Sequence, residues 1–350
     1  MKNHFQRVNI SVNRESWQSV LTGTKKKILF IGGSLNQTSM LHRISKYLPE
    51  YDNYFTPYYT DGKELIALKL GLLENTVLGG KLGKMTVEYL EDNRLQVDFG
   101  GSRNNYDLVV TSSDLIIQRN IRDKKIILVQ EGMTDPQNWL YYVVKYLKLP
   151  RYFASTSTNG LSDAYIKFCV ASEGYKEFFI KSGCNPDKIE VTGIPNFDNC
   201  KEYCNNNFPY KDYVLVCTSD ARETLRIENR IKFIRDAVKI ANGRQMIFKL
   251  HPNENHIRAT REINKYAPGA LVYESGNAEE MVANCSVLIT IYSSLVYKGL
   301  ALGKEVYSKF NLDELKKLTP IQNDGQSAKN IADVCRRYLE EVKVFNELNN

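Results

Sequence analysis

Polar residues that could bind an anion or move a proton follow several apolar stretches of this sequence. The clearest case is "IFKLHPNENH" (247–256), in which a His-Pro pair ends an apolar, strand-like run. The chain holds only four histidines, and two of them, His251 and His256, lie in this stretch. Imidazole can donate to phosphate oxygens, Pro252 restricts the backbone beside it, and Lys249 would add charge on the same side of the strand. An ordinary strand end with a proline turn is the alternative.

Two carboxylates also follow apolar runs. Glu131 stands in "QEG" directly after "KIILV", and partial burial there would raise its pKa toward the range useful for proton transfer. Asp220 ends "DYVLVCTSD" (212–220), with Ser219 before it and Arg222 shortly after it. A carboxylate in this position could act as a nucleophile. The alternatives are a surface-exposed Glu131 and an Asp220 that caps a helix beginning near Arg222.

Small residues follow two further strand candidates. Gly32 and Gly33 precede Ser34 after the first run, where they allow close backbone approach and expose the N–H groups of the next helix. The turn lacks the full dinucleotide-binding and Walker patterns, so nicotinamide or ATP binding is poorly supported. Ser293 and Ser294 follow "VLITIY", where hydroxyl and N–H groups can hold a phosphate. An ordinary strand-to-helix turn and an ordinary N-cap are the alternatives.

Short apolar runs alternate with helical patterns along most of the chain. Because these runs are nearly continuous rather than alternating, they are typical of parallel strands covered on both faces. Two β-α series in tandem predict an α/β fold of two Rossmann-like doubly wound domains that face a cleft. The strands are expected at 27–33, 106–112, 125–132, 165–172, 188–193, 212–220, 245–250, 270–275, 286–294 and 304–308.

The length of 350 residues exceeds what one core comfortably organises, so two domains are expected. A polar stretch at 192–212, with two prolines and three consecutive asparagines, indicates the boundary. We predict a first Rossmann-like domain over 1–195 and a second over 196–350, the latter ending in a long helix over 326–346. Ligands of such sheets bind at the carboxyl ends of the strands, where the polar residues above lie.

Composition narrows the class of protein. The net charge of +7 favours anionic partners, but no long basic run supports nucleic-acid binding. No apolar run approaches the roughly 20 residues of a membrane-spanning helix, and the N-terminus lacks a signal-peptide core, so we expect a cytoplasmic protein. Several of the seven cysteines lie in apolar contexts typical of buried free thiols, and no ligand set completes a zinc site around Cys200 and Cys204.

Three motifs carry a resemblance to a known group of enzymes. "QEG", "KLHPNE" and "IYSS" resemble the acidic-Gly, His-Pro and serine motifs of bacterial transferases that use CMP-activated acidic sugars, including sialyltransferases. "VTGIPNFDN" and "YSSLVYKGLALGKEVY" resemble the wider two-Rossmann (GT-B) group, which includes CDP-glycerol transferases and UDP-sugar epimerases. "QEG" together with "TSDARE" is most similar to the retaining β-Kdo transferases of capsule and O-antigen synthesis. The resemblance spans residues 25 to 310.

The resemblance implies roles for individual residues. It implies that Asp220 is the nucleophile and Glu131 the acid/base of a double displacement with net retention. It also implies that the domain over 1–195 is the acceptor side and that the domain over 196–350 binds the nucleotide sugar, where His251, Ser293 and Ser294 would bind the CMP phosphate. The other residues expected on the nucleotide side are Pro252, Lys249 and Tyr292, and those expected near the donor or acceptor sugar are Gly32, Gly33, Ser34, Gly132, Ser219, Arg222 and Gly193.

The implied reaction moves an acidic sugar, with Kdo as the best match, from CMP to a bacterial surface glycan such as capsule or lipopolysaccharide. The sequence has no D-x-D tripeptide, and a single leaving phosphate can be stabilised by imidazole, hydroxyls and a helix N-terminus, so no metal or other cofactor is expected. A lipid-linked glycan at the inner membrane is a candidate acceptor, and other domains of a polysaccharide synthase are candidate partners. Two alternatives stay open: a GT-B transferase or epimerase using UDP-sugars or CDP-alcohols, and a non-catalytic sugar-nucleotide-binding module.

Overall fold

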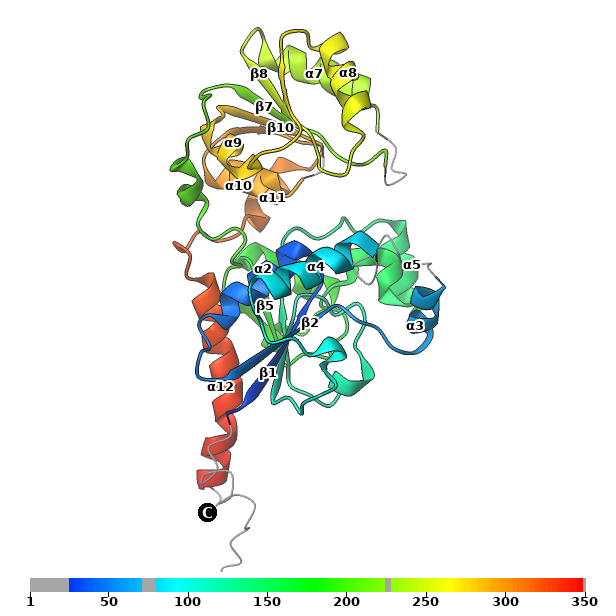
Figure 1. Ribbon diagram of the computed structural model, residues 1–350, viewed down its shortest axis with the longest axis vertical. Coiled ribbons are helices and arrows are strands. Elements are labelled where there is room, and N and C mark those ends of the chain that lie inside the picture. The colour runs from blue at the N-terminus through cyan, green and yellow to red at the C-terminus, as the bar shows by residue number, and fades with distance from the viewer. Residues whose placement is uncertain (1–24, 71–79, 224–227, 292, 349–350) are drawn as a thin grey trace, which may run out of the picture.

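The computed structural model describes residues 25–70, 80–223, 228–291 and 293–348. It contains two parallel sheets in two lobes stacked along the long axis of the molecule (Figure 1). Helices cover both faces of each sheet. The prediction of two Rossmann-like doubly wound domains is confirmed.

The first lobe is built on a six-stranded sheet with the order β2-β1-β3-β4-β5-β6. From β1 the chain adds β2 on one side and then β3 to β6 on the other, so the strand order reverses between β1 and β3. Ligands of such sheets bind at a switch point of this kind. Its strands are β1 (Lys27–Gly32), β2 (Asp52–Pro57), β3 (Leu108–Thr111), β4 (Ile126–Val129), β5 (Lys167–Val170) and β6 (Ile189–Val191).

The second lobe has a five-stranded sheet with the order β11-β10-β7-β8-β9, and its switch point lies between β7 and β10. All strand pairs of both sheets are parallel, for example Val216 beside Phe248 and Ile289. Its strands are β7 (Val214–Cys217), β8 (Met246–Lys249), β9 (Leu271–Tyr273), β10 (Val287–Thr290) and β11 (Glu305–Tyr307).

Helices connect the strands and supply the outer layers. Among the described residues, no helix has the length and apolar character needed to cross a membrane. The α-helices are α2 (Leu35–Ser45), α3 (Gly62–Lys69), α4 (Gly80–Asp92), α5 (Trp139–Tyr146), α6 (Glu173–Ser182), α7 (Arg230–Ala241), α8 (His256–Tyr266), α9 (Ala278–Asn284), α10 (Leu295–Ala301), α11 (Leu312–Leu318) and α12 (Ser327–Leu348), and the 3-10 helices are η1 (Phe99–Gly101), η2 (Arg119–Ile121), η3 (Arg151–Thr158), η4 (Pro186–Lys188) and η5 (Cys200–Cys204).

Each predicted strand segment contains a strand of the structure, but the sequence did not indicate β2. This strand lies at the edge of its sheet, where an isolated bridge from Phe55 to Val97 is added to its pairing with β1. Four of its six residues are partly exposed, and its sequence, DNYFTP, lacks an apolar run. Six of the seven cysteines are buried free thiols, as expected, whereas Cys204 is exposed.

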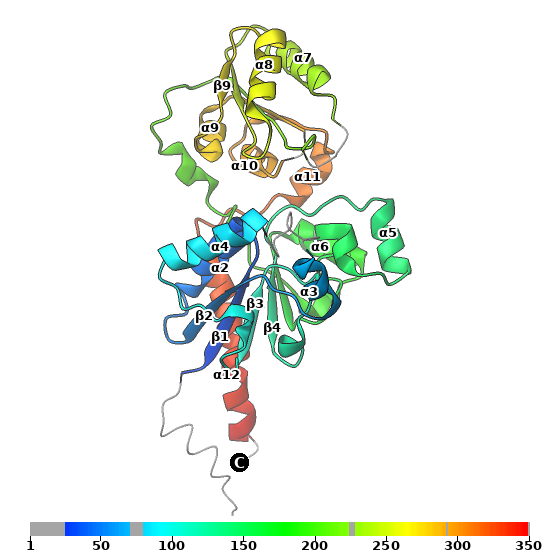
Figure 2. The ribbon, with the colours of Figure 1, turned by 45° about the vertical axis from the view of Figure 1, so that its right-hand side comes forward.

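The terminal helix forms nearly where it was predicted but does not pack on the second sheet. Its Ile331, Cys335 and Leu339 are buried with Met40 and Ile44 of α2 against the first sheet. Figure 2 shows α12 running down alongside the first lobe. The helix expected at the end of the second domain therefore packs, through its apolar stripe, on the first lobe.

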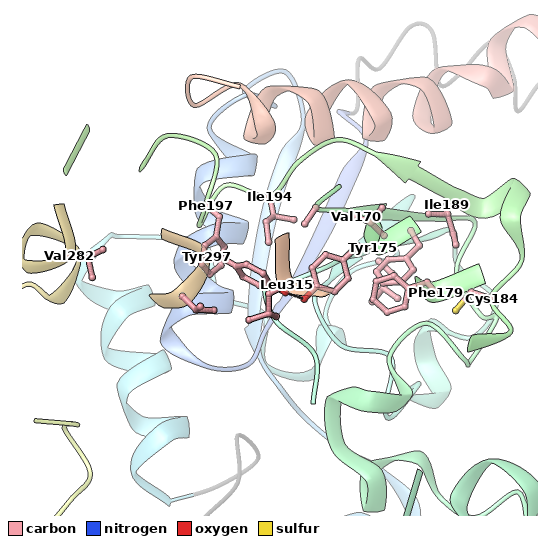
Figure 3. Packing of buried hydrophobic residues seen from close by; sticks show 14 of the residues in the cluster. Val170, Tyr175, Phe179, Cys184, Ile189, Ile194, Phe197, Val282, Tyr297 and Leu315 are labelled. Atoms are coloured by element: carbon pink, nitrogen blue, oxygen red, sulfur yellow. Dashed lines mark hydrogen bonds between the residues drawn. The ribbon is translucent and has the colours of Figure 1, made fainter. Parts of the chain in front are cut away.

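The two lobes are joined by a shared hydrophobic cluster as well as by two chain crossings. Tyr175 of α6 and Tyr297 of α10 are both buried and share a hydrogen bond of 2.7 Å between their hydroxyls. Figure 3 shows these rings together with Phe197 and Leu315 in one cluster. A Cβ on Gly174 would lie 1.9 Å from the Lys317 carbonyl oxygen, so α6 and α11 can approach this closely only with glycine there.

Candidate active site

Three cavities lie where strand ends of the two lobes meet, and they share lining residues. The central cavity, of about 370 Å³, is lined from both lobes by Asn36, Ser39, Arg43, Glu131, Gly132, Met133, Asn196, Phe197, Tyr203, Glu279, Ser294, Leu295 and Lys298. The nucleotide-side cavity, of about 420 Å³, is lined by Tyr203, Cys217, Thr218, Lys249, Leu250, His251, Pro252, Gly276, Asn277, Ala278, Glu279, Ser293 and Leu295.

The side cavity, of about 700 Å³, opens next to the central one. Met133 and Ser294 line both, while Ser293 lines the side and the nucleotide-side cavities. The three spaces therefore meet at residues 293–295, directly after β10 and at the switch point of the second sheet. The side cavity is lined by Met133, Thr134, Asp135, Pro136, Asn138, Leu140, Phe153, Ala154, Ser155, Ser293, Ser294 and Phe310.

Glu131 projects into the central cavity and is held by two neutral donors. Ser34 Oγ donates to Glu131 Oε1 at 3.1 Å, and Gln37 Nε2 donates to Oε2 at 2.6 Å. Both donors belong to the capping box that starts α2, in which Ser34 Oγ also accepts from the Gln37 N–H and Gln37 Oε1 accepts from the Ser34 N–H. The start of α2 is thus locked to the carboxylate after β4.

Burial raises the pKa of Glu131, and the hydrogen bonds from Gln37 and Ser34 offset only part of this increase. Neutral donors stabilise a carboxylate less than a paired cation would, so the desolvation cost of the charged form prevails. A carboxyl with a raised pKa can both release and take up a proton closer to neutral pH. The alternative of a surface-exposed Glu131 is wrong, since the residue is partly buried.

Gly32 and Gly33 allow the contact between β1 and the first turn of α2. A Cβ on Gly32 would lie 2.4 Å from Thr38 Oγ1, and a Cβ on Gly33 would lie 1.8 Å from Gln37 Oε1. Since Gln37 holds Glu131, a side chain at Gly33 would displace the group that orients the carboxylate. The structure therefore brings the predicted first turn and Glu131 together.

The segment that crosses to the second lobe is fixed against the same carboxylate. Arg43 Nη1 donates to the Pro195 carbonyl at 2.9 Å, and Arg43 also bonds Asn196 Oδ1. Asn196 Nδ2 donates to the Glu131 carbonyl at 3.4 Å. A Cβ on Gly132 would lie 3.2 Å from the Phe197 ring, so Gly132 serves close packing against this crossing. Sequence reasoning missed Arg43, because its partners lie far along the chain.

On the second lobe, a buried ion-pair network fixes the backbone of the His-Pro turn. The His251 N–H donates to Glu254 Oε1 at 2.8 Å and to Thr218 Oγ1 at 3.1 Å. Arg230 Nη1 donates to Glu254 Oε2 at 2.8 Å, and both side chains are almost fully buried. Arg230 also pairs with Glu228. Glu254 was inside the "KLHPNE" motif but not assigned a role.

The ring of His251 is oriented by its own turn. Nδ1 accepts from the Asn253 N–H at 3.2 Å and lies 3.7 Å from Asp220 Oδ2, and Asn253 Nδ2 donates to the same carboxylate oxygen at 3.5 Å. With Nδ1 as an acceptor, Nε2 carries the proton and can donate to a ligand. His256 Nε2 lies 3.1 Å from the His251 carbonyl oxygen.

Asp220 therefore lies beside His251 rather than beside Glu131. The residues that line the central cavity include Glu131 but not Asp220. The carbonyl of Asp220 accepts from the Glu223 N–H at 3.0 Å in a turn. The next described helix, α7, begins at Arg230 with Asn229 as its N-cap, and residues 224–227 before it lie outside the described part of the chain.

Lys249, Pro252 and Ser293 line the nucleotide-side cavity with His251, and Ser294 lies at its junction with the other two. Burial lowers the pKa of Lys249, and its ammonium donates to the Leu250 carbonyl at 2.9 Å. Ser293 Oγ accepts from the Leu295 N–H at 3.3 Å, whereas Ser294 makes no side-chain cap on α10. Tyr292 lies outside the described residues.

Three predicted sugar-side residues are engaged elsewhere. Arg222 forms a bidentate pair with Glu262 of α8, with both distances 2.9 Å. Ser219 Oγ donates to Glu228. Gly193, with φ +72°, packs so closely on the first residue of α12 that a Cβ would lie 2.2 Å from Ser327 Oγ. These contacts explain the three residues through local structure.

The structure adds a charged pair that the sequence did not indicate. Lys298 Nζ donates to Glu279 Oε1 at 2.7 Å and lies 5.3 and 4.9 Å from the ring centres of Phe197 and Tyr203. Burial raises the pKa of Glu279, but the charge and hydrogen bond of Lys298, together with smaller contributions, lower the pKa overall. Lys298 lies in "YSSLVYKGLALG", one helical turn after Ser294, and that spacing was the available signal.

Several solved structures share this architecture. A candidate UDP-N-acetylglucosamine 2-epimerase from Listeria monocytogenes has a TM-score of 0.58 and 13% identity, covering 91% of this chain and 97% of its own. MnaA of S. aureus, in a co-structure with UDP, has a TM-score of 0.53 and 13% identity, with 90% and 97% covered. The UDP-GlcNAc 2-epimerase from Neisseria meningitidis bound to UDP-GlcNAc has a TM-score of 0.52 and 12% identity, with 89% and 100% covered.

No protein-family model matches the sequence, and no curated protein matches it. At such low identities the structural similarity establishes the fold alone. The chain has the GT-B arrangement of two Rossmann-like domains, as the sequence indicated.

Proposed function

We propose that this chain is a sugar-nucleotide-dependent transferase, with the nucleotide on the second lobe and Glu131 as acid/base. The observation that carries the proposal is the position of the Glu131 carboxyl in a cavity that both lobes line and that joins the nucleotide-side cavity. The volumes of both cavities fall within the usual range for small-molecule sites. A donor bound across the junction would place its anomeric carbon between the two lobes.

The second lobe offers the groups that a leaving phosphate needs. His251 can donate through Nε2, and the Ser293 hydroxyl lines the same cavity. Lys249 also lines this cavity and carries a positive charge. Preorganised donors of this kind stabilise developing negative charge. Lys298 and Glu279 line the central cavity, and Glu279 also lines the nucleotide-side cavity. The Lys298 ammonium can attract a bound phosphate while it keeps its hydrogen bond to Glu279.

In its finer form the proposal names CMP-Kdo as donor and a retaining double displacement. Asp220 would attack the anomeric carbon, forming a glycosyl ester as the bond to the CMP phosphate breaks. The acceptor hydroxyl would then attack that carbon and release Asp220, giving its proton to Glu131. The support for this form is the resemblance of "QEG", "KLHPNE", "IYSS" and "TSDARE" to the β-Kdo transferases, together with the contact between Asp220 and His251.

A second candidate is a UDP-sugar 2-epimerase, which the shared fold of the UDP-bound and UDP-GlcNAc-bound structures favours. An acid/base with a raised pKa would serve proton transfer on a bound sugar as well as on an acceptor hydroxyl. The two candidates differ in the nucleotide bound and in the need for an acceptor.

Nucleotide choice is tested by thermal shift with CMP, UDP and CDP, because preferential ligand binding to the native state raises the melting temperature. Stabilisation by CMP alone supports the CMP-sugar donor, whereas stabilisation by UDP or CDP alone contradicts it. Incubation with CMP-Kdo and a panel of glycan acceptors, or with UDP-GlcNAc alone, followed by mass spectrometry and sugar analysis, then separates transfer from epimerisation. Nucleotide binding without conversion of any donor would indicate a binding module.

The nucleophile is tested by Asp220→Asn, with Asp187→Asn on the surface of the first lobe as the matched control. Because an amide cannot form the glycosyl ester, transfer should be lost while nucleotide binding and folding persist. In the wild type, incubation with donor alone should leave one sugar mass on the peptide that contains Asp220. An active Asp220→Asn enzyme would exclude the double displacement and leave Glu131 as the base of an inverting transferase.

A further inference from the structure

An exposed aromatic patch lies on the first lobe next to the side cavity. It is formed by Trp139, Tyr142 and Tyr146 of α5, by Leu147 after it, and by Tyr152 and Phe153 of η3, all of them exposed. Trp139 and Tyr146 keep 74% and 75% of their surface exposed. Side chains of this size and number are seldom left in water on a soluble face without a partner.

The aromatic residues form a stripe rather than a scatter. Trp139, Tyr142 and Tyr146 follow the spacing of one helical face, and the rings of Tyr142 and Tyr146 stack at 6.4 Å. The opposite face of α5 carries Tyr141 and Val144, which are buried. Helix α5 therefore carries large apolar or aromatic side chains on both faces, and those of the inner face are buried in the fold.

The electrostatics of the segment indicate the kind of partner. Residues 136–162 contain no Asp or Glu but carry Lys145, Lys148 and Arg151. Lys148 is exposed, and Lys145 stays exposed while donating to the Ser182 carbonyl at 2.7 Å. Glu64 of α3, which interacts with Tyr152, is an acidic neighbour at the border of the patch. The patch is thus aromatic and positively charged.

We propose that the aromatic patch docks the protein on the surface of an anionic phospholipid bilayer. Trp and Tyr favour the headgroup level, where the ring is buried and its polar atom stays hydrated, and lysines beside them are attracted by anionic lipids. A second copy of this chain suits the patch less well, because a two-fold contact through it would bring the lysines of both copies together.

The location of the patch gives the docking a consequence. Phe153 belongs to the patch and also lines the side cavity, which reaches Ser293 and Ser294. In both ribbon views α5 lies at the outer side of the first lobe, away from α12 (Figures 1 and 2). A glycan anchored in the same bilayer would therefore enter beside the patch. This consequence rests on the proposed transferase function, whereas membrane docking does not.

Flotation of the full chain with vesicles tests the docking. Binding is expected to vesicles of phosphatidylcholine with phosphatidylglycerol, to be much weaker with phosphatidylcholine alone, and to decrease as salt rises. Trp139→Ser with Tyr146→Ser should lower the vesicle-bound fraction about tenfold or more. The matched control Ile257→Ser, at a residue of α8 that is 77% exposed, should bind like the wild type.

A second pair of variants separates charge from apolar contact. Lys148→Glu should lower binding to anionic vesicles about fivefold or more, since each basic residue near the surface contributes roughly that factor. Lys232→Glu on α7 should leave binding unchanged. Without vesicles, the thermal shift caused by nucleotides should be the same for the wild type and for all four variants. Failure of membrane docking can therefore be told apart from failure of the proposed activity.

Three outcomes would overturn the proposal. They are the same binding to neutral and anionic vesicles, full binding by the Trp139→Ser, Tyr146→Ser variant, and no vesicle binding by a wild type that forms a dimer which this variant loses. The last result would assign the patch to a second copy.

Discussion

Glu131 on the first lobe and His251 on the second are anchored by different kinds of contact. Glu131 is held at its carboxyl by a hydroxyl and an amide from one helix start. His251 is held at its backbone N–H by Glu254, whose charge is matched by buried Arg230, while its ring accepts from the Asn253 N–H of its own turn and lies 3.7 Å from the Asp220 carboxylate. The first arrangement gives the Glu131 carboxylate no paired cation, so its pKa is raised. The second fixes the main chain of His251 and leaves its imidazole Nε2 able to bind a ligand.

This difference is consistent with the roles proposed above for Glu131 and His251. A proton-transferring group needs a pKa that its surroundings can move, and neutral donors allow that. A phosphate-binding group must be held in a fixed position. The buried Arg230–Glu254 pair holds the His251 backbone, and its two charges compensate each other. Four experiments test the comparison.

The largest effect is expected for Glu131→Gln. The amide keeps the size of the side chain and can still accept from Ser34, but it cannot take up the proton of an acceptor. Turnover should fall by about 10² to 10⁴ while nucleotide affinity stays unchanged, measured by steady-state kinetics and titration. Glu177→Gln, an exposed carboxyl of α6, is the control. Unchanged turnover would remove Glu131 from the chemistry.

Removing the buried cation on the second lobe should cost nearly as much, but in stability. Arg230→Met leaves Glu254 and Glu228 buried without their partner, which costs about 3 to 5 kcal/mol of unfolding free energy. The matched change Arg222→Met breaks the more exposed pair with Glu262 and should cost about 1 kcal/mol. Urea denaturation measures both. Equal losses of unfolding free energy would show that the buried network behind the His251 backbone stabilises the fold no more than the exposed pair does.

His251→Ala should have a smaller effect, confined to the ligand. Loss of one hydrogen bond to a charged phosphate weakens nucleotide binding by about 1 to 3 kcal/mol, with little change in melting temperature. His256→Ala, which removes only a contact to the His251 carbonyl, should weaken binding less. Calorimetric titration of both variants checks the order. Wild-type affinity in His251→Ala would refute its phosphate role.

The smallest effect concerns pH. Because burial raises the pKa of Glu131 in the folded state, its contribution to stability is full below the unfolded pKa and is lost as pH rises through the folded pKa. Glu131→Gln should therefore gain in stability relative to the wild type as pH rises from acid to neutral. Melting temperatures across this range measure the trend. The opposite slope would show that the Ser34 and Gln37 bonds outweigh burial.

The sequence by itself determined the strand ends and hence the edges of the cleft. Short, nearly continuous apolar runs are typical of parallel strands covered on both faces, and Glu131, His251, Asp220 and Ser293 each follow such a strand within three residues. Since parallel strands end on the same edge, two β-α series were enough to predict two doubly wound sheets with polar residues at their carboxyl ends.

The tertiary structure decided which of these residues meet and which serve the fold. The partner of Arg222 is Glu262, that of Arg43 is the 195–196 segment, and that of α12 is the first sheet. Each of these contacts joins residues far apart along the chain. Local patterns fix where a strand or helix forms, but only the packed arrangement fixes distances, burial and the pKa of Glu131, because these depend on groups from distant parts of the chain.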